Sequence, residues 1–241
     1  MSKFVKVYNN QSAAKMANMT FETVATIRTG FADKFGIPRQ SGIVNSLRGK
    51  IIFEKKYRDA NAIKGLENTT HIWILWEFSM NKREKWSPMV RPPRLGGNSK
   101  MGVFATRSPF RPNPIGLSAV KLDKIDYTDK LGPVLYVSGA DLMDGTPIYD
   151  IKPYIPYADS IPEAENSVFG NQDNTTDVVF ECDINSIDQY TLNTLAEILK
   201  QDPTPAYTKD SDKTFSFEYE NVHVEFTKTD GKIIVRNIEL I

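Results

Sequence analysis

The residues most suited to chemistry lie in a proline-rich loop between two apolar segments, Phe104-Ala-Thr-Arg-Ser-Pro-Phe-Arg-Pro-Asn-Pro-Ile-Gly116. Its prolines fix φ and bias the residues before them toward extended geometry, so the loop should be stiff. Because the loop is stiff, Arg107, Arg111 and Asn113 lose little conformational entropy when they bind a ligand. This suits recognition of a carboxylate, a phosphate or a base edge. The alternative is a rigid turn whose arginines only pair with carboxylates of the protein.

The stretch leading into this loop is basic, although the whole chain is not. Lys+Arg and Asp+Glu both total 30 among the 241 residues, so no global field draws the protein to nucleic acid. Between residues 82 and 111, however, Glu84 is the lone acid among many lysines and arginines, with Trp86 beside them. Such a segment can bind RNA through phosphates and base stacking, or it can be a solvated charged face.

A third cluster runs from Asp141 to Tyr154. Asp144-Gly145 predicts a turn directly after an apolar strand, where backbone groups can face a ligand at the end of the sheet. Two carboxylates, Asp144 and Asp150, lie in this cluster with Lys152. A plain hairpin is the alternative interpretation of the turn.

The elements that must position these residues are predominantly β before residue 160. Short segments rich in β-branched or aromatic residues favour a closed or partly closed sheet. The segment His71–Phe78 is apolar almost without alternation, which predicts a strand covered on both faces. Asp59–Leu66 is predicted as a short helix. Strands are expected at Phe21–Thr29, Lys50–Phe53, His71–Phe78, Met101–Thr106, Leu117–Leu122 and Val134–Gly139.

Beyond residue 160 the composition shifts toward Pro, Glu, Asn, Gln, Ser and Gly, which predicts a linker. Apolar residues at helical spacing from Ile184 to Leu199 then predict an amphipathic helix, capped by Ser186 or Asn185. Alternating segments and the turn at Asp230-Gly231 predict a β-meander after it. We therefore expect a flexible leader over 1–20, a β-rich domain over 21–160, a linker over 161–176 and a small α+β domain over 177–241.

Several classes of protein are excluded by the sequence. A single cysteine, Cys182, rules out an internal disulfide, and with only His71 and His223 besides it no histidine–thiolate metal site is expected. We find no glycine-rich dinucleotide loop, Walker loop, nucleophile elbow or HExxH motif. The longest apolar run falls far short of the ~20 residues that span a bilayer, so we expect no membrane anchor and a cytoplasmic location.

Together these motifs resemble those of the TsaA-like, or TrmO, family of tRNA N6-methyltransferases. Phe104–Gly116 is similar to the family signature, Val90–Gly97 to its arginine–proline loop, and Asp144–Pro147 with Asp150–Tyr154 to its later motif. The resemblance implies a mainly β fold, in which a β-barrel domain that binds S-adenosylmethionine precedes a small α+β domain. It also implies a homodimer with the cofactor near the interface. By motif matching the cofactor-binding residues would be Pro38, Arg39, Gln40, Ser79, Met80, Arg107, Leu117, Asp144, Gly145, Thr146 and Pro147.

The substrate implied by the resemblance is N6-threonylcarbamoyladenosine at position 37, in the anticodon stem-loop of a tRNA, which would be methylated on N6. The lone pair of N6 is delocalised into the purine and the carbamoyl group, so removal of the N6 proton should assist methyl transfer. Asp144 or Asp150 is the candidate base. The candidate substrate-binding residues are Arg94, Arg111, Asn113 and Lys152, the two arginines for the threonyl carboxylate.

Two other functions stay open at this point. The chain could be a module that binds S-adenosylmethionine or RNA without transferring a methyl group. It could also be a hydrolase that uses Asp144 and Asp150, although no nucleophile–base arrangement or metal cluster accompanies them in the sequence.

Overall fold

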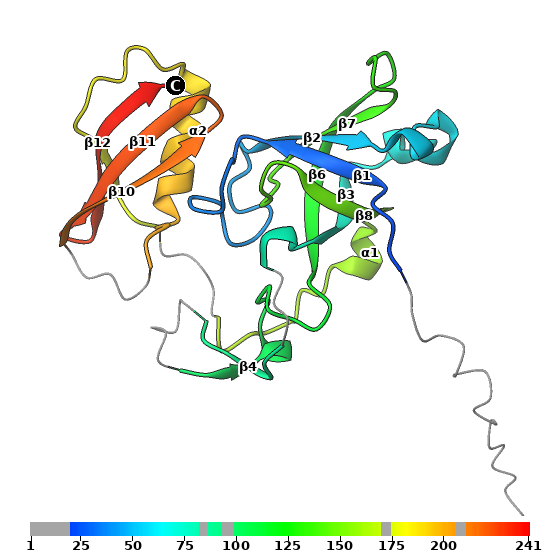
Figure 1. Ribbon diagram of the computed structural model, residues 1–241, viewed down its shortest axis with the longest axis horizontal. Helices are drawn as coiled ribbons and strands as arrows, with labels where there is room; N and C mark the ends of the chain where they lie inside the picture. The colour runs from blue at the N-terminus through cyan, green and yellow to red at the C-terminus, as the bar shows by residue number, and fades with distance from the viewer. Residues whose placement is uncertain (1–19, 82–85, 93–98, 170–174, 206–210) are drawn as a thin grey trace, which may run out of the picture.

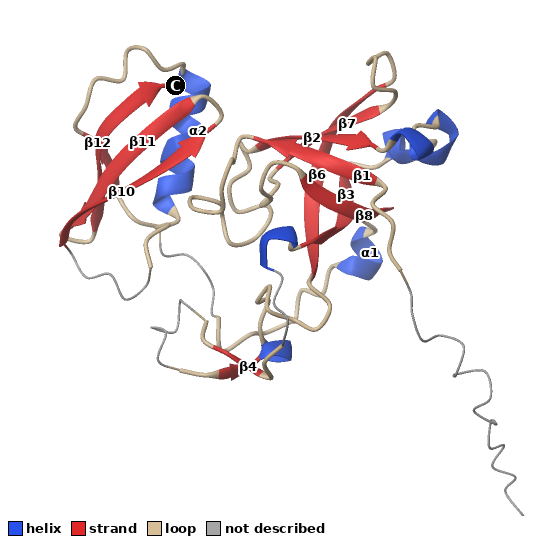
Figure 2. Ribbon diagram, viewed as in Figure 1, coloured by secondary structure: helices blue, strands red, loops and turns tan. Residues whose placement is uncertain are grey.

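The computed structural model describes residues 20–81, 86–92, 99–169, 175–205 and 211–241. Nearly all of the predicted leader lies outside these ranges, as does the predicted substrate residue Arg94. Within them the fold is mainly β, as expected, with a closed barrel, a four-stranded sheet and a small two-stranded sheet (Figure 2).

The first body is a closed barrel of six strands in the order β1-β2-β7-β6-β3-β8, with every neighbouring pair antiparallel. Closure removes the unpaired edges that an open sheet would expose. The strands are β1 (Ala25–Thr29), β2 (Arg48–Phe53), β3 (His71–Glu77), β6 (Ile115–Asp126), β7 (Val134–Ser138) and β8 (Thr146–Pro153).

Only one face of strand β3 is fully buried, the face that points into the barrel core. Ile72, Ile74 and Trp76 are buried in the barrel core, whereas Trp73 and Leu75 between them are only partly buried. The prediction that this strand is covered on both faces was therefore wrong. Trp73 explains part of the apolar run, because its indole Nε1 donates to Asp159 Oδ2 (3.0 Å) in the short helix α1 (Pro156–Asp159) that lies over the strand.

Two predicted elements take a different local form. The segment expected as a strand at Met101–Thr106 is a two-residue strand, β5 (Met101–Gly102), which pairs with β4 (Met89–Val90) and then becomes a 3₁₀ helix (Val103–Ala105). The expected helix at 59–66 is a pair of 3₁₀ turns, Ala60–Ile63 and Leu66–Asn68, because Gly65 between them adopts φ +101°. Further 3₁₀ turns are Lys55–Tyr57 and Ser79–Asn81. No helix in the described part of the chain is long and apolar enough to cross a membrane.

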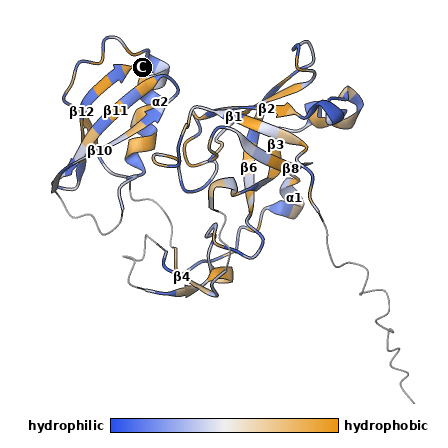
Figure 3. Cartoon of the chain, in the orientation of Figure 1, coloured by the Kyte–Doolittle hydropathy of each residue, from blue (hydrophilic) through white to orange (hydrophobic). Residues whose placement is uncertain are grey.

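The second body is a four-stranded sheet with one helix packed against it. The sheet has the order β10-β11-β12-β9, with β9 parallel to β12 and the other pairs antiparallel. Hydrophobic and hydrophilic residues alternate along its strands (Figure 3). Its elements are β9 (Val178–Phe180), α2 (Gln189–Lys200), β10 (Ser211–Tyr219), β11 (Val222–Thr229) and β12 (Lys232–Leu240).

The helix α2 begins two or three residues later than the sequence suggested. Its N-cap is Asp188, whose Oδ1 accepts a hydrogen bond from Thr191 N (3.1 Å), not Ser186 or Asn185. Asp188 lies three residues before Thr191, which is the spacing at which a capping side chain reaches a backbone N–H of the first helical turn. Asn185 and Ser186 are exposed and lie too far before this turn to cap it.

The connection between β1 and β2 joins the two bodies. This segment, residues 30–47 (the β1–β2 loop), places Phe31, Val44 and Leu47 in the same hydrophobic core as α2 and the second sheet. In Figure 1 it extends from the barrel toward α2 and β10. Phe35 stacks against Phe215 with ring centroids 6.2 Å apart. The loop thus begins and ends in the barrel, and its apolar side chains pack into the second core.

Candidate functional site

Strand direction brings three long connections to one end of the barrel. Because neighbouring strands are antiparallel, the β1–β2 loop, residues 78–114 (the β3–β6 loop) and residues 139–145 (the β7–β8 loop) all leave the same end. The three loops touch there. Arg107 Nη1 of the β3–β6 loop donates to Gln40 Oε1 of the β1–β2 loop, and Gly42 N donates to Gly139 O (2.9 Å) of the β7–β8 loop. This convergence is the candidate site.

A chain of polar contacts runs from the barrel core to this end. Trp76 Nε1 donates to Ser118 Oγ (3.0 Å), and Ser118 Oγ donates to Asp141 Oδ1 (2.7 Å). Burial raises the pKa of the Asp141 carboxyl, against the hydrogen bond from Ser118 and the nearby charge of Arg107. Sequence reasoning gave Asp141 no role of its own. Its place directly after an apolar strand and at the head of the third motif was the available signal.

Gly116, the last residue of the loop signature, is required by the close approach of Trp76. A Cβ atom at Gly116 would come within 2.2 Å of Trp76 Cε2. Trp76 itself is buried, so its ring has little room to move. The glycine therefore allows the indole to reach Ser118.

Asp144 fastens the β7–β8 loop to strand β1. Its Oδ1 accepts from Thr29 N (3.0 Å), and its Oδ2 lies 3.0 Å from Nη2 of Arg28. Gly145 follows with φ +76°, and its N donates to Ile27 O (2.9 Å). Thr146 and Pro147 then begin β8. Both oxygens of Asp144 are thus engaged by the protein, and because each carboxylate oxygen has two lone pairs, these contacts leave it further acceptor capacity.

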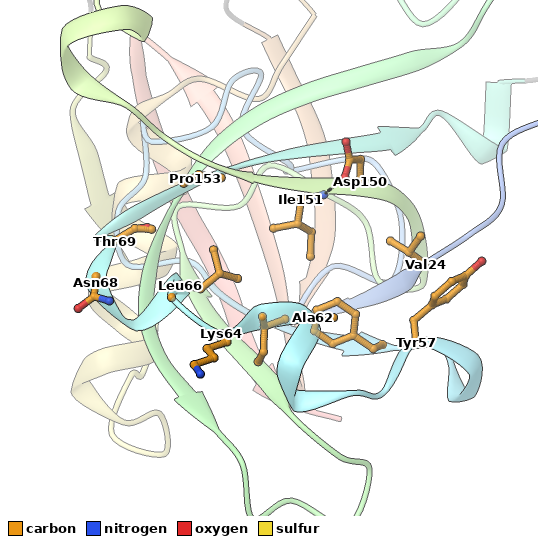
Figure 4. Close-up of a pocket in the computed structure, with 13 residues that line it drawn as sticks. Val24, Tyr57, Ala62, Lys64, Leu66, Asn68, Thr69, Asp150, Ile151 and Pro153 are labelled. Carbon is orange, nitrogen blue, oxygen red and sulfur yellow. Dashed lines mark hydrogen bonds between the residues drawn. The ribbon is translucent and has the colours of Figure 1, made fainter.

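Asp150 and Lys152 are not brought to this end. They form an ion pair of 2.7 Å on β8, and Asp150 lines a cavity of about 610 Å³ at the opposite end of the barrel with Val24, Tyr57 and Pro153 (Figure 4). The two candidate bases, Asp144 and Asp150, therefore do not form one pair. Among the described residues no group of three or more His, Cys, Asp and Glu side chains is arranged to hold a metal ion.

Arg111 binds main-chain carbonyls of its own loop. Its Nη1 donates to Thr106 O (2.7 Å) and Val103 O (3.2 Å), and its guanidinium lies 5.7 Å from the centroid of the Phe104 ring. This differs from both interpretations of the sequence, an arginine turned to a ligand and an arginine paired with a carboxylate. Asn113 is exposed on the same loop, and its main-chain oxygen accepts from Ile115 N (2.8 Å).

An exposed apolar surface covers the β3–β6 loop and the start of β6. Phe104 is 72% exposed, Met80 69%, Leu117 56% and Trp86 53%, and the rings of Trp86 and Phe104 have centroids 6.4 Å apart. Ser79 lies beside Met80 on the 3₁₀ turn after β3. Sequence reasoning missed Phe104, whose exposure the motif did not reveal. Exposed apolar side chains in contact, such as Trp86 and Phe104, mark surfaces that bind ligands, other chains or nucleic-acid bases.

The remaining predicted residues lie in the β1–β2 loop. Pro38 is buried, and the exposed Arg39 donates through Nη2 to Thr204 O (3.5 Å) of the second body. Gln40 receives Arg107, as described above. The candidate site therefore gathers Gln40, Arg107 and Asp141 directly, with Asp144 holding the third loop in place.

Family models match both bodies of the chain. The model of the tRNA-methyltransferase O N-terminal domain matches residues 26–160, and that of the TrmO C-terminal domain matches residues 175–241.

Known proteins resemble the chain over most of its length. It is 40% identical over 235 residues to the tRNA (adenine(37)-N6)-methyltransferase of Escherichia coli strain K12, across 93% of this chain and 99% of that protein. It is 43% identical over 145 residues to a putative S-adenosylmethionine-dependent methyltransferase, RcsF, of Pseudomonas aeruginosa, across 60% of this chain and 58% of the other. A crystal structure of TrmO from Pseudomonas aeruginosa superposes with a TM-score of 0.75 at 28% identity, across 93% of this chain and 98% of that one.

Proposed function

This chain belongs to the TrmO family, and we propose that it is an S-adenosylmethionine-dependent tRNA methyltransferase that acts on N6 of adenosine 37. We further propose that its substrate is N6-threonylcarbamoyladenosine in the anticodon stem-loop, and that it works in the cytoplasm. The observation that carries the proposal is the convergence of three loops, each with a predicted cofactor residue, at one end of the barrel. The relative from Escherichia coli, which carries that activity in its name, spans nearly the whole chain.

The chemistry of the residues at this end fits S-adenosylmethionine. Its carboxylate matches the guanidinium of Arg107, and its ribose and amino groups match the side chain of Gln40 and the main-chain groups around Gly145. Its flat adenine matches exposed apolar side chains such as Leu117 and Met80. When bound, the cofactor supplies a methyl group activated by a sulfonium. The predicted set Pro38–Gln40, Ser79, Met80, Arg107, Leu117 and Asp144–Pro147 is proposed as its binding site.

For the substrate, the protein has to hold N6 in line with the methyl group and to accommodate the N6 proton. Positioning alone can supply a large part of the rate. Of the two predicted bases, Asp144 is at the candidate site, where its carboxylate keeps acceptor capacity beside its contacts with Thr29 N and Arg28. Arg111 and Asn113 lie near the C-terminal end of the β3–β6 loop and are proposed to face the threonylcarbamoyl group. Lys152 forms an ion pair with Asp150 away from this end of the barrel.

A homodimer is part of the proposal. Phe104, Met80 and Leu117 are exposed apolar residues of the β3–β6 loop and the start of β6, and a second copy docked on this part of the chain would cover them. Closed two-fold symmetry is the simplest arrangement in which each copy shields the other.

The test is methyl transfer from labelled S-adenosylmethionine to two preparations of one tRNA, which differ only in whether adenosine 37 carries the threonylcarbamoyl group. We expect label on N6 of the modified tRNA and little on the unmodified one, because a site built to bind a carboxylate loses that contact when the group is missing. Equal labelling of both would contradict the proposed substrate. Cofactor binding without any labelling would instead identify a non-catalytic binding module.

A further inference from the structure

The β1–β2 loop belongs to two bodies at once. Phe31 is 1% exposed and packs edge-on against Tyr219 with ring centroids 5.1 Å apart, and Val44 and Leu47 lie in the same second core. Gly36 faces the ring of Phe217 so closely that a Cβ atom would come within 2.8 Å. Both flanks of the loop are therefore fixed by the second body.

The tip of the loop lies on the barrel. Gln40 accepts from Arg107, and Gly42 N donates to Gly139 O. The main chain of Ser41 also acts to lower the pKa of the Asp141 carboxyl, against its burial. The predicted cofactor residues Pro38–Gln40 thus sit between a flank held by one body and contacts made to the other.

Helix α2 holds the flank nearest to β2 through a set of polar contacts that we call the α2 clasp. Tyr190 Oη donates to Ser46 O, Ser46 Oγ donates to Glu197 Oε2 (2.8 Å), and Arg48 Cζ lies 3.7 Å from the centroid of the Tyr190 ring. Tyr190 and Glu197 are seven residues apart on α2, so they project from the same face of the helix. Burial raises the pKa of Tyr190 further above neutral pH, where the phenol is protonated in any case and can donate.

We propose that α2 is a positioning element for the candidate site: through Tyr190 and Glu197 it holds the β1–β2 loop so that Pro38–Gln40 face Arg107, and the second body thereby sets the affinity for S-adenosylmethionine. This inference rests on the proposed function. Its physical basis is the cost of ordering a loop, which weakens ligand binding unless the loop is already ordered before the ligand arrives.

The experiment compares variants of the full chain on and beside the α2 clasp. Tyr190→Phe removes the donation to Ser46 O but keeps the ring under Arg48, and Glu197→Ala removes the acceptor for Ser46 Oγ. We expect each to raise the Kd for S-adenosylmethionine about two- to tenfold in the absence of RNA, since each removes one hydrogen bond. Glu197→Gln keeps an acceptor and should restore most of the affinity. Asn193→Ala, on the exposed side of α2, is the matched control and should bind as the wild type does.

The affinity for tRNA is measured in parallel, at a temperature where circular dichroism shows every variant folded. If tRNA affinity falls while the Kd for S-adenosylmethionine is unchanged, the second body holds RNA and the inference is wrong. Unchanged affinity for both ligands with a lower Tm would reduce the α2 clasp to a structural contact, which also overturns it. A wild-type protein that binds no S-adenosylmethionine would instead defeat the proposed function, and the inference with it.

Discussion

Two loops at the same end of the barrel are held in opposite ways. The β1–β2 loop has its apolar side chains in the second hydrophobic core, so distant parts of the chain determine its shape. The β3–β6 loop is held near its C-terminal part by its own groups, where Arg111 and Thr106 bind main-chain carbonyls, and it leaves Trp86 and Phe104 exposed. One loop is therefore preformed by packing, and the other presents an apolar surface to whatever binds there.

The largest expected effect comes from exchanging one phenylalanine in each loop for alanine. Phe31→Ala removes a ring that is buried in the second core and should lower the free energy of unfolding by about 3–5 kcal/mol. Phe104→Ala removes an exposed ring and should change it by less than about 0.5 kcal/mol. Urea unfolding followed by circular dichroism measures both. A cost at Phe104 as large as that at Phe31 would contradict the distinction between the two loops.

A smaller effect is expected where the β3–β6 loop enters the barrel. Gly116→Ala places a methyl group against the ring of Trp76 and should destabilise the protein by about 1–3 kcal/mol. Gly102→Ala is the matched control, since a Cβ atom there meets nothing within 4 Å and its φ is −59°. If both variants unfold at the same urea concentration, the close approach of Trp76 does not constrain the loop.

The smallest effect concerns Asp141, where the tip of the β1–β2 loop and Arg107 meet. Burial raises the pKa of this carboxyl above its ordinary 3.8, so folding favours the protonated form. Stability is then lost as pH rises from the ordinary pKa through the raised one, because the folded state binds more protons in that window. The stability of the wild type relative to Asp141→Asn should fall over this window, as measured by urea unfolding at a series of pH values.

Asp188 provides a control of opposite sign. Hydrogen bonds from the Thr191 hydroxyl and main chain lower the pKa of this capping carboxyl, so its contribution is present above pH 3.8 and is lost as pH falls through the lowered pKa. The stability of the wild type relative to Asp188→Asn should therefore rise with pH up to about the ordinary pKa. A flat difference for Asp141→Asn beside a sloping one for Asp188→Asn would show that Asp141 is not desolvated in the folded protein.

The sequence by itself determined the mainly β class, five of the six barrel strands, and the helix followed by a meander. It missed β8 (Thr146–Pro153), which pairs with both β1 and β3 and closes the barrel. The predicted elements follow from apolar periodicity and turn residues, which act over a few residues. The sequence also marked the proline-stiffened segment Phe104–Gly116 as the place for chemistry, and the motifs there resemble the family to which the chain belongs. Local patterns indicated little about the β1–β2 loop, because the polar stretch Ile37–Gly42 has no apolar periodicity, and Pro38–Gln40 were assigned to the cofactor only through the family resemblance.

Only the tertiary structure decided which of the marked side chains meet. Asp144 and Asp150 are six residues apart, yet one is fixed to β1 by Arg28 and the other faces the opposite end of the barrel. Phe31 packs against Tyr219 from almost the other end of the chain. Such contacts depend on barrel closure and on the docking of two hydrophobic cores, which no pattern of neighbouring residues encodes. Local periodicity therefore specified the strands, and long-range packing specified the site.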